Sequence, residues 1–112
     1  MAYLTITPAT STYRIRAGSE VLGQTSRAVN LQEGGSAAVV YVPRDNVDMS
    51  RLELSTRQTR CPHKGTCSYY HIRAASGRLE NAIWSYETPL PGAEAIAGHL
   101  AFYPNLVSLE VI

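Results

Sequence analysis

A chain of 112 residues has the length of one domain, and its 45% apolar and 17% charged residues exclude a disordered chain and leave enough apolar side chains for one core. The formal net charge is +1, so the chain has no large excess of Lys and Arg of the kind that a surface for nucleic-acid phosphates carries. We therefore expect one domain, residues 1–112, that binds neither nucleic acid nor a membrane.

The first half of the chain predicts short β-strands. β-Branched and aromatic residues alternate with polar ones, which is the pattern of a half-buried strand, over residues 3–7, 12–16, 21–24 and 27–31. A Gly-rich loop then precedes the strongest predicted strand, residues 37–42, which Pro43 ends because proline has no N–H to donate.

The second half continues in the same way. Strands are predicted at 68–73 and 79–86, joined by a turn at 75–77, and again at 100–103 and 107–111. The only helical turn expected is short, at 93–97. Many short strands without a helix of useful length favour an all-β, antiparallel sandwich or barrel-like domain with at most one short helix.

The cysteines and the N-terminal residues bear on the compartment. The first residues lack the basic start and apolar run of a signal peptide, and no stretch reaches membrane-spanning length. We therefore expect a cytoplasmic protein. Cys61 and Cys67 are too few for a disulfide scaffold, so both are expected to be free thiols.

The densest group of chemically reactive side chains is Arg60-Cys61-Pro62-His63-Lys64-Gly65. Zinc accepts cysteine and histidine ligands, and two further candidates, Cys67 and His71, follow this segment. Five residues separate the two cysteines, which is more than in the short turn between the paired cysteines of a zinc finger. The sequence also has no second cysteine pair to complete the four ligands of a zinc site. We expect no metal and no cofactor.

Two chemical roles remain open for this segment. Lys64 is the only lysine beside nine arginines, and an anion-binding pocket could use Lys64, Arg60 and Arg44, with Tyr41, Trp84 and Tyr86 as its walls. Alternatively, Cys61 is a nucleophile whose pKa nearby cations lower. A phosphate-binding loop is not expected, because the segment lacks the first glycine and the following helix of that motif. His99 is expected to cap a turn.

Several motifs in order resemble the domain of unknown function 427 family, over most of the chain from Arg14 onward. They are Tyr41-Val42-Pro43-Arg44-Asp45, Thr59-Arg60-Cys61-Pro62-His63-Lys64-Gly65-Thr66, Ser68-Tyr69-Tyr70, Glu80-Asn81-Ala82-Ile83-Trp84-Ser85-Tyr86 and Ile96-Ala97-Gly98-His99-Leu100-Ala101-Phe102-Tyr103.

The resemblance implies a β-tent fold similar to that of methionine sulfoxide reductase B, without the metal-binding cysteine pairs of some β-tent proteins. It also implies that the family's motif residues match Cys61, Lys64, Asn81, Trp84 and Tyr86 here, whereas Cys67 stands where members commonly carry a small residue. The family has carried a nucleotidyltransferase label, but the sequence offers no carboxylate pair to hold the magnesium that such chemistry needs.

The leading hypothesis is a pocket for a small polar or anionic ligand around the Cys-Pro-His-Lys-Gly motif. Its polar contacts come from Arg60, His63, Lys64 and Asn81, and its walls from the aromatic residues Tyr41, Trp84 and Tyr86. One alternative is a thiol-dependent enzyme in which Cys61 attacks and Lys64 or His63 tunes it. Another is an interaction module that uses a strand edge, as a monomer or homodimer.

Overall fold

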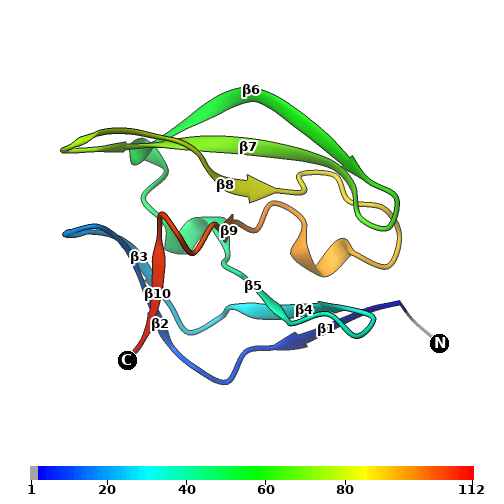
Figure 1. The fold of residues 1–112 in the computed structure, drawn as a ribbon. Coiled ribbons are helices and arrows are strands. Elements are labelled where there is room, and N and C mark those ends of the chain that lie inside the picture. The colour runs from blue at the N-terminus through cyan, green and yellow to red at the C-terminus, as the bar shows by residue number, and fades with distance from the viewer. Residues whose placement is uncertain (1–2) are drawn as a thin grey trace.

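A computed structural model describes residues 3–112 and contains three antiparallel sheets (Figure 1). The first sheet has the order β1-β4-β5, formed by Leu4–Pro8, Val29–Glu33 and Val39–Tyr41. The second has the order β10-β2-β3, formed by Ser108–Val111, Tyr13–Ala17 and Glu20–Thr25. The third has the order β6-β7-β8-β9, formed by Leu52–Cys61, Gly65–Ala74, Gly77–Ser85 and Ala101–Phe102.

The all-β class expected from the sequence is confirmed. Within residues 3–112 there is no α-helix, only the 3₁₀ turns η1 at Arg44–Asn46, η2 at Met49–Arg51 and η3 at Glu94–Ile96. The sequence predicted the last of these and missed the other two. The predicted strand at 37–42 is shorter than expected, because β5 pairs with only three residues of β4 and residues 37 and 38 are exposed.

Two side-chain clusters fill the space between the sheets. The main core includes Ile15, Val42, Ile72 and Leu100. The tyrosine–cysteine cluster contains the buried residues Leu31, Tyr41, Cys67, Tyr69, Tyr86, Ala93, Ile96 and Ala101, with Cys61, Trp84 and Tyr103 among those packed against it.

Strand β7 contributes to both clusters. Cys67 and Tyr69 belong to the tyrosine–cysteine cluster and Tyr70 and Ile72 to the main core, so the alternation of buried residues is interrupted between Tyr69 and Tyr70. The pairing with both neighbouring strands is also irregular near this point. On β8, Asn81 has a φ of 49°, which makes it the only non-glycine residue with positive φ in the described chain. Such irregularities bend a strand and re-aim its side chains, and here they let one sheet cover two clusters.

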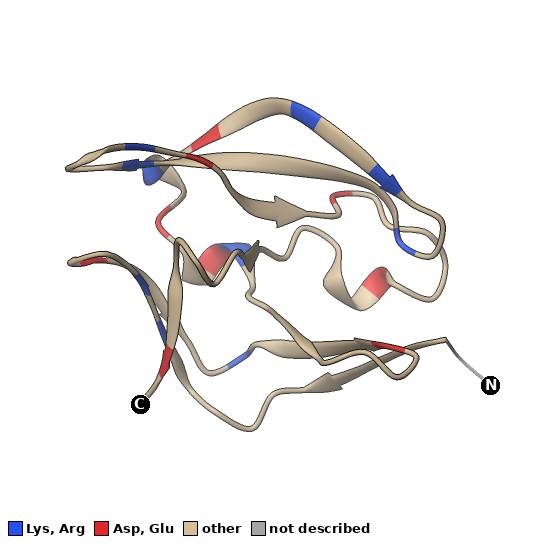
Figure 2. Cartoon of the chain, viewed as in Figure 1, with Lys and Arg blue, Asp and Glu red and all other residues tan. Residues whose placement is uncertain are grey.

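Isolated bridges connect segments that lie far apart in the sequence. Val42 pairs with Leu100, and Gly23 pairs with Val47. These contacts hold η1 between β3 and the loop that follows η3, near the middle of the molecule in Figure 1. Basic and acidic positions are interspersed along the ribbon (Figure 2), and no helix within residues 3–112 is long and apolar enough to cross a membrane.

Candidate functional site

The segment singled out by its reactive side chains forms the end of the β6–β7 hairpin. Cys61 pairs with Gly65 across the two strands, and the three residues between them make the turn. Gly65 has a φ of 107°, and a Cβ at this position would lie 3.4 Å from Cγ of Leu90. Glycine is the residue that adopts such a backbone conformation without steric cost, so the local sequence fits a tight, packed hairpin.

Lys64 points into the protein from this hairpin. Its side chain is only 9% exposed, forms an ion pair with Glu33 at the end of β4, and places Nζ 5.2 Å from the ring centre of Tyr86. A buried ammonium requires such a partner, because an unpaired charge is costly away from water. The ion pair connects the hairpin to the first sheet. It also neutralises the positive charge of Lys64, which was expected to bind an anionic ligand.

The three aromatic residues predicted as walls do meet. Trp84 Nε1 donates a hydrogen bond of 3.1 Å to the hydroxyl of Tyr41, and their rings pack edge to face. Tyr41 and Tyr86 are buried, and burial raises the pKa of both phenols above the ordinary value of 10.0. Tyr41 and Tyr86 are therefore part of the tyrosine–cysteine cluster, and the partly buried Trp84 packs against it.

Both cysteines are free thiols and both belong to the tyrosine–cysteine cluster. Cys67 is 1% exposed, whereas Cys61 is partly exposed at the end of its strand. The structure thus brings together Tyr41, Cys61, Lys64, Trp84 and Tyr86, five of the nine residues that the sequence proposed for a site.

Two of the other candidates lie on the surface of the hairpin. Arg60 is exposed, and its Nη1 donates a 3.3 Å hydrogen bond to the hydroxyl of Thr66. His63 is exposed and stacks on Tyr3, with 4.2 Å between ring centres. Neither side chain points into the group around Lys64.

Asn81 belongs to a separate polar group in the bent part of the third sheet. Its side-chain oxygen accepts a 2.6 Å hydrogen bond from Ser55, and its backbone N–H donates to Nδ1 of His71 at 2.9 Å. The contacts satisfy the irregular backbone at this point, where positive φ favours Asn over most other residues.

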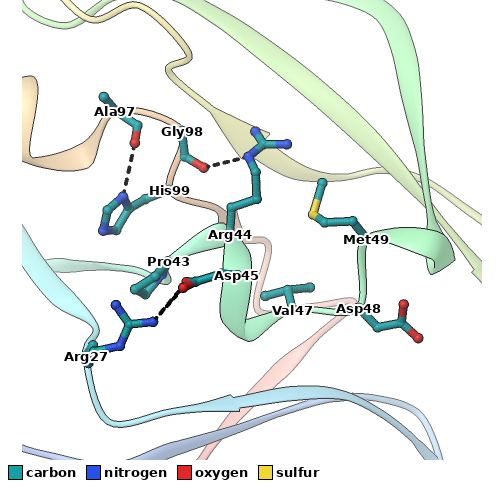
Figure 3. Close-up of a pocket in the computed structure, with 10 residues that line it drawn as sticks. All are labelled: Arg27, Pro43, Arg44, Asp45, Val47, Asp48, Met49, Ala97, Gly98 and His99. Carbon is teal, nitrogen blue, oxygen red and sulfur yellow. Dashed lines mark hydrogen bonds and ion pairs between the residues drawn. The ribbon is translucent and has the colours of Figure 1, made fainter.

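A hollow in the surface lies elsewhere, beside η1 (Figure 3). It has a volume of about 600 Å³, and we call it the Arg27 cleft. Its lining combines an apolar floor with charged and imidazole groups and consists of Arg27, Pro43, Arg44, Asp45, Val47, Asp48, Met49, Ala97, Gly98 and His99. Clefts with this mixture are the usual sites of small ligands.

Arg44 is fixed from several directions at the back of this cleft. Its Nε donates to the carbonyl oxygen of Gly98 at 3.1 Å, and its Nη1 to the hydroxyl of Tyr70 at 3.3 Å. Its Nη2 lies 2.7 Å from Glu87, which also accepts a 2.6 Å hydrogen bond from Tyr70. Burial, followed by the bond to Glu87, raises the pKa of the Tyr70 phenol. Arg44 is therefore a structural clamp between η1 and the loop containing Gly98.

Arg27 is held less completely. Its side chain is 58% exposed, and Nη2 donates to both oxygens of Asp45, at 2.9 and 3.0 Å, and to Asn46 at 3.3 Å. All three side-chain bonds use the same nitrogen, so the donors on Nε and Nη1 stay available. An arginine with unused N–H groups is well suited to bind a carboxylate or phosphate.

His99 also lines the cleft, and Figure 3 draws it above Pro43, on the same side of the view as Arg27. Its Nδ1 lies 3.2 Å from the carbonyl oxygen of Ala97, and this oxygen can only accept, so Nδ1 donates. In the neutral ring Nε2 is then an acceptor. The contact with Ala97 agrees with the turn-capping role predicted for His99, while the ring also borders the cleft.

The sequence indicated two residues of this cleft, Arg44 and His99, but not that they lie in one cleft. It assigned Arg44 to the hairpin site and missed Arg27. The signal available was the pair of motifs 41–45 and 96–103, which the Val42–Leu100 bridge brings side by side. Arg27 gave no signal, because only the folded chain places it beside Asp45.

Smaller hollows involve two of the predicted residues. Trp84 borders an apolar cleft of about 470 Å³ between β5, β9 and β10, and His63 borders one of about 240 Å³ beside Tyr3. No group of three His, Cys, Asp or Glu side chains in residues 3–112 is placed to hold a metal ion.

The fold and the Arg27 cleft define a small all-β domain with an open hollow of mixed polar and apolar lining. The chain belongs to the domain of unknown function 427 family, whose model matches residues 5–112 and whose short name carries the nucleotidyltransferase label. No curated protein matches the chain.

Proposed function

We propose that this domain binds a small anionic molecule with an apolar body in the Arg27 cleft. The observation that carries the proposal is the guanidinium of Arg27, which is held through Nη2 alone at the edge of an apolar floor. A carboxylate or phosphate group would accept from its unused donors, and the apolar part of the ligand would lie on Val47 and Met49.

The surrounding contacts support a preformed site. Arg44 fixes the carbonyl of Gly98, and the neighbouring His99 is oriented through Nδ1. A site whose walls are already ordered loses less conformational entropy when a ligand binds. The acceptor at Nε2 of His99 would select ligands that carry a hydrogen-bond donor in addition to the anionic group.

The hairpin around Lys64 is the competing location for the same function. Five of the residues proposed from the sequence gather there. The charge of Lys64, however, is already engaged by Glu33, and its side chain is nearly covered. A ligand would have to displace that internal pair, whereas at Arg27 it would meet exposed donors.

Calorimetric titration with benzoate and with inorganic phosphate distinguishes the two locations. Arg27→Ala should weaken binding at least fivefold, which is about 1 kcal/mol, because it removes the free donors. Arg60→Ala at the hairpin and Arg14→Ala on β2 should leave the affinity unchanged, and they control for the loss of one positive charge. A selective loss in Arg60→Ala would move the site to the hairpin, and wild-type protein that binds neither anion would refute the proposal.

The thiol-dependent enzyme stays an alternative proposal. The partly exposed Cys61 adjoins Lys64 in the hairpin turn, but the Lys64 ammonium faces Glu33. The cytoplasmic location, the absence of nucleic-acid binding and the monomeric or dimeric state also stay predictions.

A further inference from the structure

The two cysteines occupy the same face of the β6–β7 hairpin. Cys61 pairs with Gly65, and Thr59 pairs with Cys67, so Cys61 and Cys67 are diagonal neighbours on adjacent strands. Residues two apart along a strand share a face. The register therefore directs both sulfur atoms toward the tyrosine–cysteine cluster, to which both residues contribute.

The surroundings of two phenols agree with this placement of the two thiols. After burial, which has the largest effect, both Cys67 and Cys61 help to raise the pKa of Tyr41 and that of Tyr86. Tyr41, Tyr86 and Cys67 belong to the tyrosine–cysteine cluster, and Cys61 packs against it. The shared neighbours agree with the diagonal placement that the strand register requires.

The two thiols differ in access to solvent. Cys67 is 1% exposed, whereas Cys61 is partly exposed at the strand end. The residue opposite Cys61 is Gly65, which places no side chain between the two cysteines. Diagonal Cα atoms are about 7–8 Å apart in a regular pair, and a disulfide needs at most about 6.8 Å, so the hairpin end must close by about an ångström.

We propose that Cys61 and Cys67 form a peroxide-responsive pair that closes a reversible disulfide across the hairpin. The Cys61 thiolate attacks hydrogen peroxide, the O–O bond breaks, and hydroxide leaves, which oxidises Cys61 to a sulfenic acid. The Cys67 sulfur then attacks the sulfenic sulfur. An S–S bond forms, the S–O bond breaks, and the oxygen leaves with the thiol proton as water.

The stoichiometry is one peroxide for two thiols, and the products are one disulfide and two waters. The exposed cysteine reacts with the oxidant, and the buried one resolves the intermediate. This order follows from their access to solvent and does not depend on the ligand proposed for the Arg27 cleft.

Peptide mass spectrometry tests the pair directly. The folded protein is treated with hydrogen peroxide, alkylated with iodoacetamide, and digested with trypsin without a reductant. Trypsin cleaves after Arg60, Lys64 and Arg73, so the cysteines fall in separate peptides, residues 61–64 and 65–73. We expect these peptides to be joined in monomeric protein and to separate on reduction. Two alkylated cysteines, or an oxidised Cys61 with no linked peptide, would overturn the proposal.

Two variants test the assigned order. In Cys67→Ser the reaction should stop at the sulfenic acid of Cys61, which dimedone traps as a stable adduct. In Cys61→Ser the buried Cys67 should stay alkylatable only after denaturation, with no dimedone adduct. A dimedone adduct on Cys67 of Cys61→Ser, together with none on Cys61 of Cys67→Ser, would contradict the order.

Discussion

Lys64 and Arg27 are both cations beside a carboxylate, but their surroundings assign them different roles. The side chain of Lys64 is 9% exposed and that of Arg27 is 58% exposed. The Lys64–Glu33 pair stabilises the packing of two sheets, and its separation would leave buried charge. The Arg27–Asp45 pair is exposed and therefore contributes little to stability, and it leaves the Nε and Nη1 donors of Arg27 available to a ligand.

The buried tyrosines predict a loss of stability at alkaline pH. Burial raises the pKa of Tyr41 and Tyr86 above 10.0, the ordinary value for a phenol. Because the folded state favours the protonated form, this stabilisation is complete below pH 10.0 and is lost as the pH rises toward the folded-state pKa. The free energy of unfolding in urea should fall above pH 10.0, and tyrosinate absorbance should appear as the protein unfolds.

Tyr86→Phe provides the control, because it removes one of these phenols. Its stability should fall less steeply above pH 10.0 than that of the wild type, with a slope smaller by up to about 1.4 kcal/mol per pH unit. If both buried phenols ionise reversibly near pH 10.0 in the folded protein, this account of their burial is wrong.

At the scale of the elements, the β6–β7 hairpin is fastened to the first sheet through Lys64. Lys64→Ala should lower the free energy of unfolding by about 2 kcal/mol, because Glu33 loses its partner while it stays partly buried. Urea unfolding followed by near-ultraviolet circular dichroism measures the change.

Arg60→Ala is the matched control for that substitution, since it removes an exposed cation from the same hairpin. Its stability should change by less than about 0.5 kcal/mol. Equal and small effects of the two substitutions would mean that the Lys64 ion pair does not secure the hairpin.

The same elements show what sequence patterns can predict. Alternation located most strands, because it reflects a half-buried face. It overextended the strand at 37–42, whose length depends on the three residues of its partner β4. It also did not predict the change of phase on β7 near Tyr69, because that follows from irregular pairing with both neighbours.

At the scale of the whole molecule, the candidate site depends on contacts between distant segments. The motif residues Tyr41, Trp84 and Tyr86 were expected to share a site, and the fold does place them near one another, but as packed core. The Arg27 cleft instead needs η1, the β3–β4 connection and the loop after η3 together. No periodic pattern in the sequence predicts that these three segments lie together. Only the motifs at 41–45 and 96–103, which line part of the cleft, could be recognised.

The proposed location of the ligand site is beside Arg27 and not at the Lys64 hairpin. Two-dimensional NMR of ¹⁵N-labelled protein titrated with benzoate locates the site without any substitution. We expect saturable shifts of the backbone amides of Arg27, Val47, Gly98 and His99, which line the cleft. Shifts confined to residues 61–67, or no saturable shifts at all, would contradict it.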